Sequence, residues 1–143
     1  MINPHPPFLG VDLGGKRTGL ALSENGILAH PFTVLEAKPP HLTTVINEMV
    51  EIIKKQEIAT LIIGIPFTQD EALTSQALKV ESVIEQLGLV LKQHHLDTAI
   101  VRVNEFHSTI DAKQLYPGVE IDAASATLLL QDYIDQITPN SWA

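Results

Sequence analysis

The chain of 143 residues contains no cysteine. That absence excludes a disulfide scaffold, a cysteine nucleophile and a thiolate metal site. Cationic side chains are also scarce, because 9 Lys and Arg stand against 17 Asp and Glu, for a formal net charge of −8. Such a chain has no overall field that attracts nucleic acid or an anionic membrane. Binding to nucleic acid would therefore need a local basic patch or bound metal cations.

Aromatic residues, long apolar runs and a targeting segment are missing as well. Aromatic residues make up 5% of the chain, which leaves few platforms for stacking bases. No segment approaches the ~20 apolar residues of a membrane span, and Met1–Pro7 lacks the basic start and apolar core of a signal peptide. We expect a cytoplasmic protein without membrane contacts. Its length predicts one domain over residues 1–143, with an N-terminal arm at 1–7 and a C-terminal tail at 138–143.

Hydrophobic periodicity predicts a three-stranded meander followed by alternating helices and strands. The meander implies an antiparallel half of a sheet, and the alternation implies a parallel half. The predicted fold class is α/β, a mixed five-stranded sheet flanked by helices on both faces. The expected strands cover residues 8–13, 18–23, 27–35, 60–65 and 98–103, and the expected helices cover 42–55, 77–91, 108–115 and 121–137.

Three segments carry more specific structural signals. The near-continuous apolar run Thr60–Ile65 is typical of a central strand covered on both faces. The Asn25-Gly26 pair favours a turn with positive φ angles, and Pro31 inside the third strand favours a sheet edge or a bulge.

Three acidic residues stand at similar places in this pattern. Asp12 lies near the end of the first strand, Glu105 follows the last strand, and Asp122 lies near the start of the final helix. Ligands of open α/β sheets gather beyond the carboxyl ends of parallel strands. If the first and last strands are neighbours, Asp12 and Glu105 face one cleft, and the helix start brings Asp122 to it. Clustered carboxylates repel each other unless a hard divalent cation such as Mg²⁺ neutralises them.

Each acid also has a purely structural interpretation. Asp12 could accept hydrogen bonds from the glycine turn that follows it. Asp122 could cap the final helix, and Glu105 could be a solvated residue at a strand end. Residue types and spacing alone leave these alternatives open.

Polar residues near the acids suggest contacts to a phosphate. Lys16 and Arg17 lie in the glycine-rich turn after Asp12, where backbone amides and two cations favour an anion, although a solvated hairpin turn fits equally well. The pair Ser108 and Thr109 is typical of a helix N-cap, and its alternative role is to hold a phosphate or orient Glu105.

The residues around the three acids resemble one family. The run LGVDLGGKRTGLALS at residues 9–23 is similar to the opening of the YqgF-type proteins, described as Holliday-junction-resolvase-like proteins and pre-16S rRNA nucleases. The resemblance continues through residues 62–66 and 104–109 and ends with residues 121–133, in the right order over nearly the whole chain.

This resemblance implies an RNase H-like fold and a metal-dependent nuclease that processes the 5′ end of pre-16S ribosomal RNA. It carries the catalytic and metal-binding positions of the family over to Asp12, Glu105 and Asp122. The implied cofactor is Mg²⁺ or Mn²⁺, and the implied partner is pre-rRNA, with structured DNA as an alternative. Lys16 and Arg17 would hold the substrate phosphate. We expect a monomer or a weak homodimer.

The chain departs from the family at several phosphate-binding positions. Asn104 and Phe106 flank Glu105 where the family has an acid and an arginine, and the basic segment that commonly precedes the last acid is the short run 116–120. Fewer cations predict a flatter salt dependence of nucleic-acid binding. Two alternatives therefore stay open, a Holliday-junction-type DNA resolvase and a catalytically weak nucleic-acid-binding module. A sugar-kinase relative is disfavoured, because those enzymes enclose nucleotide between two lobes and a chain of 143 residues has the length of only one.

Overall fold

The structure is a computed structural model that describes residues 4–14, 16–36, 42–66, 75–105 and 109–137. The predicted tail at 138–143 and the first three residues of the predicted arm lie outside these ranges. None of the helices within the ranges is long and apolar enough to cross a membrane.

The described strands form one mixed sheet in the order β3-β2-β1-β4-β5. β1 pairs antiparallel with β2, and β2 pairs antiparallel with β3, whereas β1–β4 and β4–β5 are parallel pairs. The predicted meander and the predicted parallel half are therefore both confirmed. The strands are β1 (Phe8–Leu13), β2 (Arg17–Ser23), β3 (His30–Glu36), β4 (Thr60–Pro66) and β5 (Ala99–Glu105).

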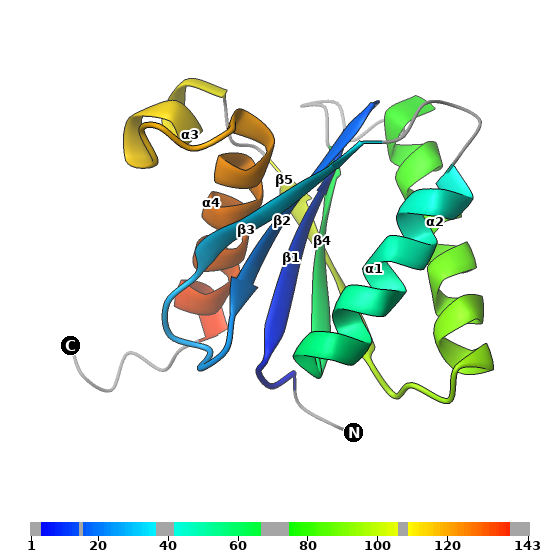
Figure 1. Ribbon diagram of the computed structural model, residues 1–143. Helices are drawn as coiled ribbons and strands as arrows, with labels where there is room; N and C mark the ends of the chain where they lie inside the picture. The colour runs from blue at the N-terminus through cyan, green and yellow to red at the C-terminus, as the bar shows by residue number, and fades with distance from the viewer. Residues whose placement is uncertain (1–3, 15, 37–41, 67–74, 106–108, 138–143) are drawn as a thin grey trace.

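Helices cover both faces of this sheet, as predicted (Figure 1). Two long helices lie against one face, and the last helix lies against the other, with a short helix packed beside its start. These helices are α1 (Leu42–Gln56), α2 (Ser75–Gln93), α3 (Thr109–Leu115) and α4 (Ile121–Ile137).

Alternation along the strands divides the core into two layers. Leu61 and Ile63 of β4 pack in the layer beneath α1 and α2, whereas Ile62 packs beneath α4. All three side chains are fully buried. The prediction that residues 60–65 form a central strand covered on both faces is thus confirmed, because β4 lies between β1 and β5.

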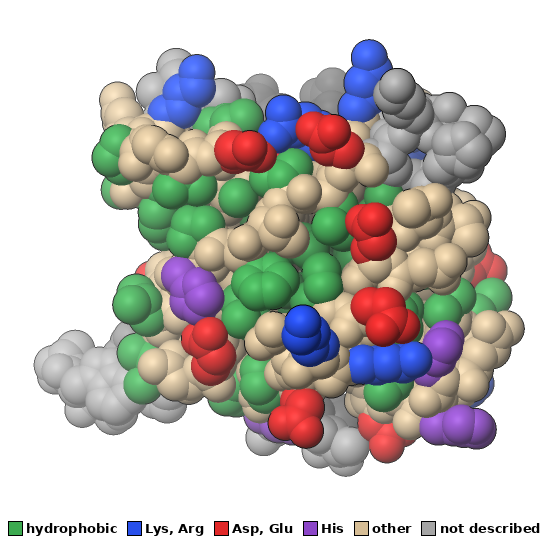
Figure 2. Space-filling view, in the orientation of Figure 1, with side chains coloured by type: hydrophobic (Ala, Val, Ile, Leu, Met, Phe, Trp, Pro, Cys, Tyr) green, Lys and Arg blue, Asp and Glu red, His purple; other side chains and the backbone are tan. Residues whose placement is uncertain are grey.

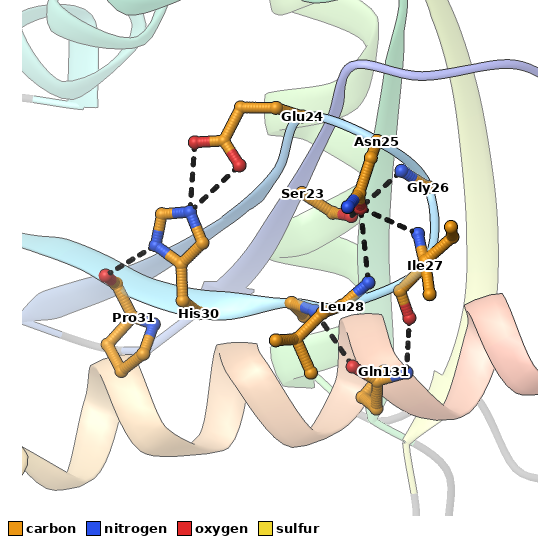
Figure 3. Close-up of polar contacts among 10 residues, drawn as sticks. Ser23, Glu24, Asn25, Gly26, Ile27, Leu28, His30, Pro31 and Gln131 are labelled. Carbon is orange, nitrogen blue, oxygen red and sulfur yellow. Dashed lines mark hydrogen bonds and ion pairs between the residues drawn. The ribbon is translucent and has the colours of Figure 1, made fainter.

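The turn between β2 and β3 is held by side chains rather than by strand pairing, as Figure 3 shows. The Asn25 Oδ1 atom accepts hydrogen bonds from the amides of Ile27 (2.9 Å) and Leu28 (3.2 Å). Gln131 of α4 accepts a hydrogen bond from the Ala29 amide at 2.8 Å and donates one to the Ile27 carbonyl at 3.0 Å. The third strand therefore starts at His30, and the prediction of a start at residue 27 is wrong because these amides are satisfied outside the sheet.

Of the two backbone signals in this hairpin, the proline signal is confirmed, and the positive φ is confirmed at Gly26 but not at Asn25. Gly26 has a φ of +74°. Pro31 lies in the edge strand β3, and the β2–β3 register shifts between Leu20 and Ala21, which pairs with Pro31. An edge position suits proline because it has no amide to donate to a neighbouring strand.

Candidate active site

Asp12 lies on the face of β1 that α4 covers. Leu9, Val11 and Leu13 belong to the opposite layer of the core. Gly10 faces α4 so closely that an added Cβ would come within 2.8 Å of Leu130. Because side chains alternate along a strand, Asp12 shares the face of Gly10. Its side chain is half-buried there, two residues nearer the carboxyl edge of the sheet.

Gly19 brings the start of α4 against this edge. It is the β2 residue directly opposite Asp12, and opposed residues of an antiparallel pair share a face. A Cβ on Gly19 would overlap the carbonyl group of Asp122 and lie 2.9 Å from the Ala123 nitrogen. Glycine is therefore needed at position 19 for α4 to approach, and this approach sets Asp122 beside the strand pair that carries Asp12.

Arg17 joins β2 to the start of α4 by two ion pairs. Its Nε atom lies 3.1 Å from Asp122 Oδ2, and its Nη2 atom lies 2.6 Å from Glu120 Oε2. Asp122 is in the first turn of α4, where the positive end of the helix dipole also favours a carboxylate. A guanidinium held by two carboxylates reaches a substrate phosphate only in competition with them. The phosphate contact that we predicted for Arg17 stays a prediction.

Glu105 ends β5 at the same edge of the sheet. It pairs with Pro66 at the end of β4, and β4 in turn runs parallel to β1. We predicted a shared cleft on the condition that the first and last strands are neighbours. That condition is wrong, because β4 lies between β1 and β5. The carboxyl ends of β1, β4 and β5 still share one edge. The Glu105 side chain lies outside the described part of the chain.

The remaining predicted contacts are only partly covered by the structure. Lys16 is exposed at the start of the turn into β2. Thr109 is the first residue of α3, and its side chain lies outside the described part, as does all of Ser108. Figure 2 shows acidic and basic side chains next to each other along the upper edge of this face of the molecule, where β1 ends in Figure 1.

The donor set at this edge has the chemistry that Mg²⁺ or Mn²⁺ requires. Asp12 and Asp122 offer carboxylate oxygens from facing elements, and hard cations prefer such ligands. Among the side chains that the structure describes, no three His, Cys, Asp or Glu are grouped as a metal site. The third predicted ligand, Glu105, is not one of those side chains, so the two aspartates are the part of the site that the structure describes.

A hollow of about 540 Å³ lies between β5 and α4. Asn104 lines its end near Glu105, and Tyr133 lines it from α4, where burial raises the pKa of the tyrosine hydroxyl. Its lining also includes Asp132 and Arg102, and the Arg102 Nε atom bonds Glu81 at 2.9 Å. None of the described residues that line this hollow is a predicted site residue, so we place the candidate chemistry at Asp12 and Asp122.

Two residues of this arrangement were not identified from the sequence. Gly19 stands inside a buried strand, and a strand glycine often marks the close approach of another backbone. That signal was available, whereas nothing in the sequence pairs Glu120 with a cation 103 residues away.

The mixed sheet in the order β3-β2-β1-β4-β5, with helices on both faces, defines the class, the RNase H-like fold. The chain matches the family model described as "RuvX: Holliday junction resolvase" over residues 7–136. It therefore belongs to the RuvX family, which confirms the resemblance drawn from its motifs.

Curated relatives and solved structures agree with this membership. A "Putative pre-16S rRNA nuclease" of Synechococcus sp. (strain JA-2-3B'a(2-13)) is 32% identical, with 90% of this chain and 77% of the relative covered. A relative of the same name from Roseiflexus sp. (strain RS-1) is 26% identical, with 89% and 92% covered. The Thermus thermophilus RuvC structure superposes with a TM-score of 0.60 at 11% identity, covering 92% of this chain and 96% of the other. This likeness shows the RNase H-like fold.

Proposed function

We propose that this chain is a divalent-cation-dependent nuclease that hydrolyses phosphodiester bonds in the 5′ extension of pre-16S rRNA in the cytoplasm. The observation that carries the proposal is the approach of α4 to β2 at Gly19, which sets Asp122 beside the strand pair holding Asp12. A shared edge of β1, β4 and β5 supports Glu105 as the third member.

We assign a cation-binding role to the acidic residues and a phosphate-binding role to the polar and basic residues near them. Asp12, Glu105 and Asp122 would hold one or two Mg²⁺ or Mn²⁺ ions. Such ions, when bound, activate a water molecule and neutralise charge on the leaving oxygen. Lys16, exposed in the turn after β1, would contact a substrate phosphate, and so would Thr109 at the start of α3 and its sequence neighbour Ser108. In this proposal, β1, β2 and α4 hold Asp12 and Asp122 in position.

RNA is the substrate that the name of the relatives, pre-16S rRNA nuclease, supports. The same name occurs in relatives from different bacteria that this chain covers over most of their length. The family description names Holliday junction resolvases, and one structural neighbour is "T. thermophilus RuvC in complex with Holliday junction substrate", with a TM-score of 0.58. Cleavage of four-way DNA junctions is therefore the second candidate function. The loss of cations at positions where the family binds phosphate motivates a third, nucleic-acid binding without turnover.

The test compares three substrates under three ionic conditions. A 5′-extended pre-16S rRNA, a DNA duplex and a four-way DNA junction are each incubated with purified chain in Mg²⁺, in Mn²⁺ or in EDTA. Asp12→Asn is the variant, and Asp97→Asn is its matched control, because Asp97 is exposed in the loop before β5 at the opposite edge of the sheet.

We expect cleavage of the rRNA precursor that requires both the cation and Asp12, with Asp97→Asn cleaving as wild type. Faster cleavage of the junction than of the RNA would reassign the chain to DNA. Binding of RNA without cleavage in either cation would reassign it to the binding module. Equal cleavage by wild type and Asp12→Asn would place the activity in a contaminant.

A further inference from the structure

The two carboxylates around Arg17 differ in their relation to the proposed site. Asp122 is a proposed cation ligand, whereas Glu120 precedes α4 and is not. The contact to Glu120, at 2.6 Å, is shorter than the contact to Asp122, at 3.1 Å. The guanidinium is thus held more closely by the carboxylate that stands outside the proposed site.

Exposure separates the two carboxylates in the same way. The Glu120 side chain is 64% exposed, and the Asp122 side chain is 25% exposed. A charge interaction is screened less where water is partly excluded, so water screens the charge of Arg17 less at Asp122 than at Glu120. A divalent cation that binds Asp122 therefore meets a positive charge already bonded to that carboxylate.

We infer that Arg17 is the counter-ion of Asp122 when no cation is bound, and that Glu120 holds the guanidinium aside when a cation binds Asp122. Arg17 is then a positioning residue that acts through Asp122, not a substrate contact. The inference rests on the proposed function, because it takes Asp122 as a cation ligand. It also explains how a carboxylate stays ordered in the cation-free protein, since second partners commonly orient the carboxylates that ligate metals.

This arrangement predicts changes of opposite sign for the two partners. Arg17→Gln removes the competing charge, so Mn²⁺ binds more tightly, by about threefold, the size typical of a partly exposed ion pair. Glu120→Gln frees Arg17 to pair with Asp122 alone, so Mn²⁺ binds more weakly by a similar factor of about three. Because Glu120 acts only through Arg17, Glu120→Gln has no further effect when Arg17→Gln is already present.

The experiment measures free Mn²⁺ by electron paramagnetic resonance during titration of the full chain, without nucleic acid. It compares wild type, the two single variants and the double variant, with Asp122→Asn to identify the site. Lys113→Gln is the matched control for net charge, because Lys113 is exposed on α3, which packs against α4.

The outcomes distinguish this inference from the proposed function. Weaker Mn²⁺ binding in Arg17→Gln, or an equal effect of Glu120→Gln in both backgrounds, would overturn the role of Arg17 and leave the cation site intact. Tighter binding in Lys113→Gln equal to that in Arg17→Gln would overturn it too, because net charge would then be the cause. Mn²⁺ binding that survives Asp122→Asn would contradict the proposed site itself. Circular dichroism checks that each variant is folded.

Discussion

Gly19→Ala is the substitution that tests most sharply how the site is built. The added methyl group would overlap the carbonyl carbon and oxygen of Asp122 and lie 2.9 Å from the nitrogen of Ala123. Real Cβ atoms do not come within 3.0 Å of such atoms, so the start of α4 must move. Overpacking of this kind costs about 1–3 kcal/mol, and these neighbours are backbone atoms, which cannot rotate out of the way as a side chain can. We expect a loss of unfolding free energy in this range.

The same shift displaces Asp122 from its place beside the strand pair that carries Asp12. A misplacement of about 1 Å at a reacting centre lowers a rate by about 100-fold, so Gly19→Ala is expected to lose activity as well as stability. Urea unfolding followed by circular dichroism measures the stability, and cleavage of the rRNA precursor measures the activity.

Gly88→Ala is the matched control for this prediction. Gly88 lies inside α2, and a Cβ there meets nothing within 4 Å. Alanine in a helix interior is favoured over glycine, so this variant gains about 0.5–1 kcal/mol and cleaves as wild type. A Gly19→Ala variant that unfolds at the same urea concentration as wild type would refute the close approach on which the site depends.

Two further predictions concern the turn between β2 and β3. The pKa of Glu24 is lowered from its ordinary 4.5, first by a backbone hydrogen bond and then by the His30 side chain, so its contribution to stability is present above pH 4.5 and lost as pH falls through the lowered pKa. The difference in urea midpoint between wild type and Glu24→Gln should therefore shrink between about pH 6 and about pH 3, and a constant difference would contradict this. Gln131→Ala leaves the amide of the buried Ala29 without its 2.8 Å acceptor, at a cost of about 1–3 kcal/mol. Hydrogen exchange at Ala29 should accelerate, and unchanged exchange would show that another acceptor replaces Gln131.

Much of the fold follows from local patterns in the sequence. The run Thr60–Ile65 is apolar at nearly every position, and only a strand buried on both faces uses such a run. Gly26 permits the positive φ of the turn, and Pro31 restricts its strand to an edge or a bulge. These features are predictable because each is decided within a few residues.

The features that the sequence did not reveal depend on contacts between distant segments. The third strand begins at His30 because Gln131, about 100 residues further on, bonds the backbone of the turn. Arg17 looks like a phosphate ligand in the sequence, and only the packing of α4 on β2 pairs it with Glu120 and Asp122. Likewise, the sequence predicts three acids at one edge of the sheet. It does not reveal that β4 separates β1, which carries Asp12, from β5, which carries Glu105.

The central claim is that Asp12, Glu105 and Asp122 act at one cation-dependent site. Single-turnover cleavage of a 5′-extended pre-16S rRNA in Mg²⁺ tests it most directly, with Asp12→Asn, Glu105→Gln and Asp122→Asn beside wild type. Loss of any one ligand should lower the rate by at least about 100-fold while the circular dichroism spectrum stays unchanged. Cleavage by Glu105→Gln at the wild-type rate would contradict the account, because the site would then lack its third carboxylate.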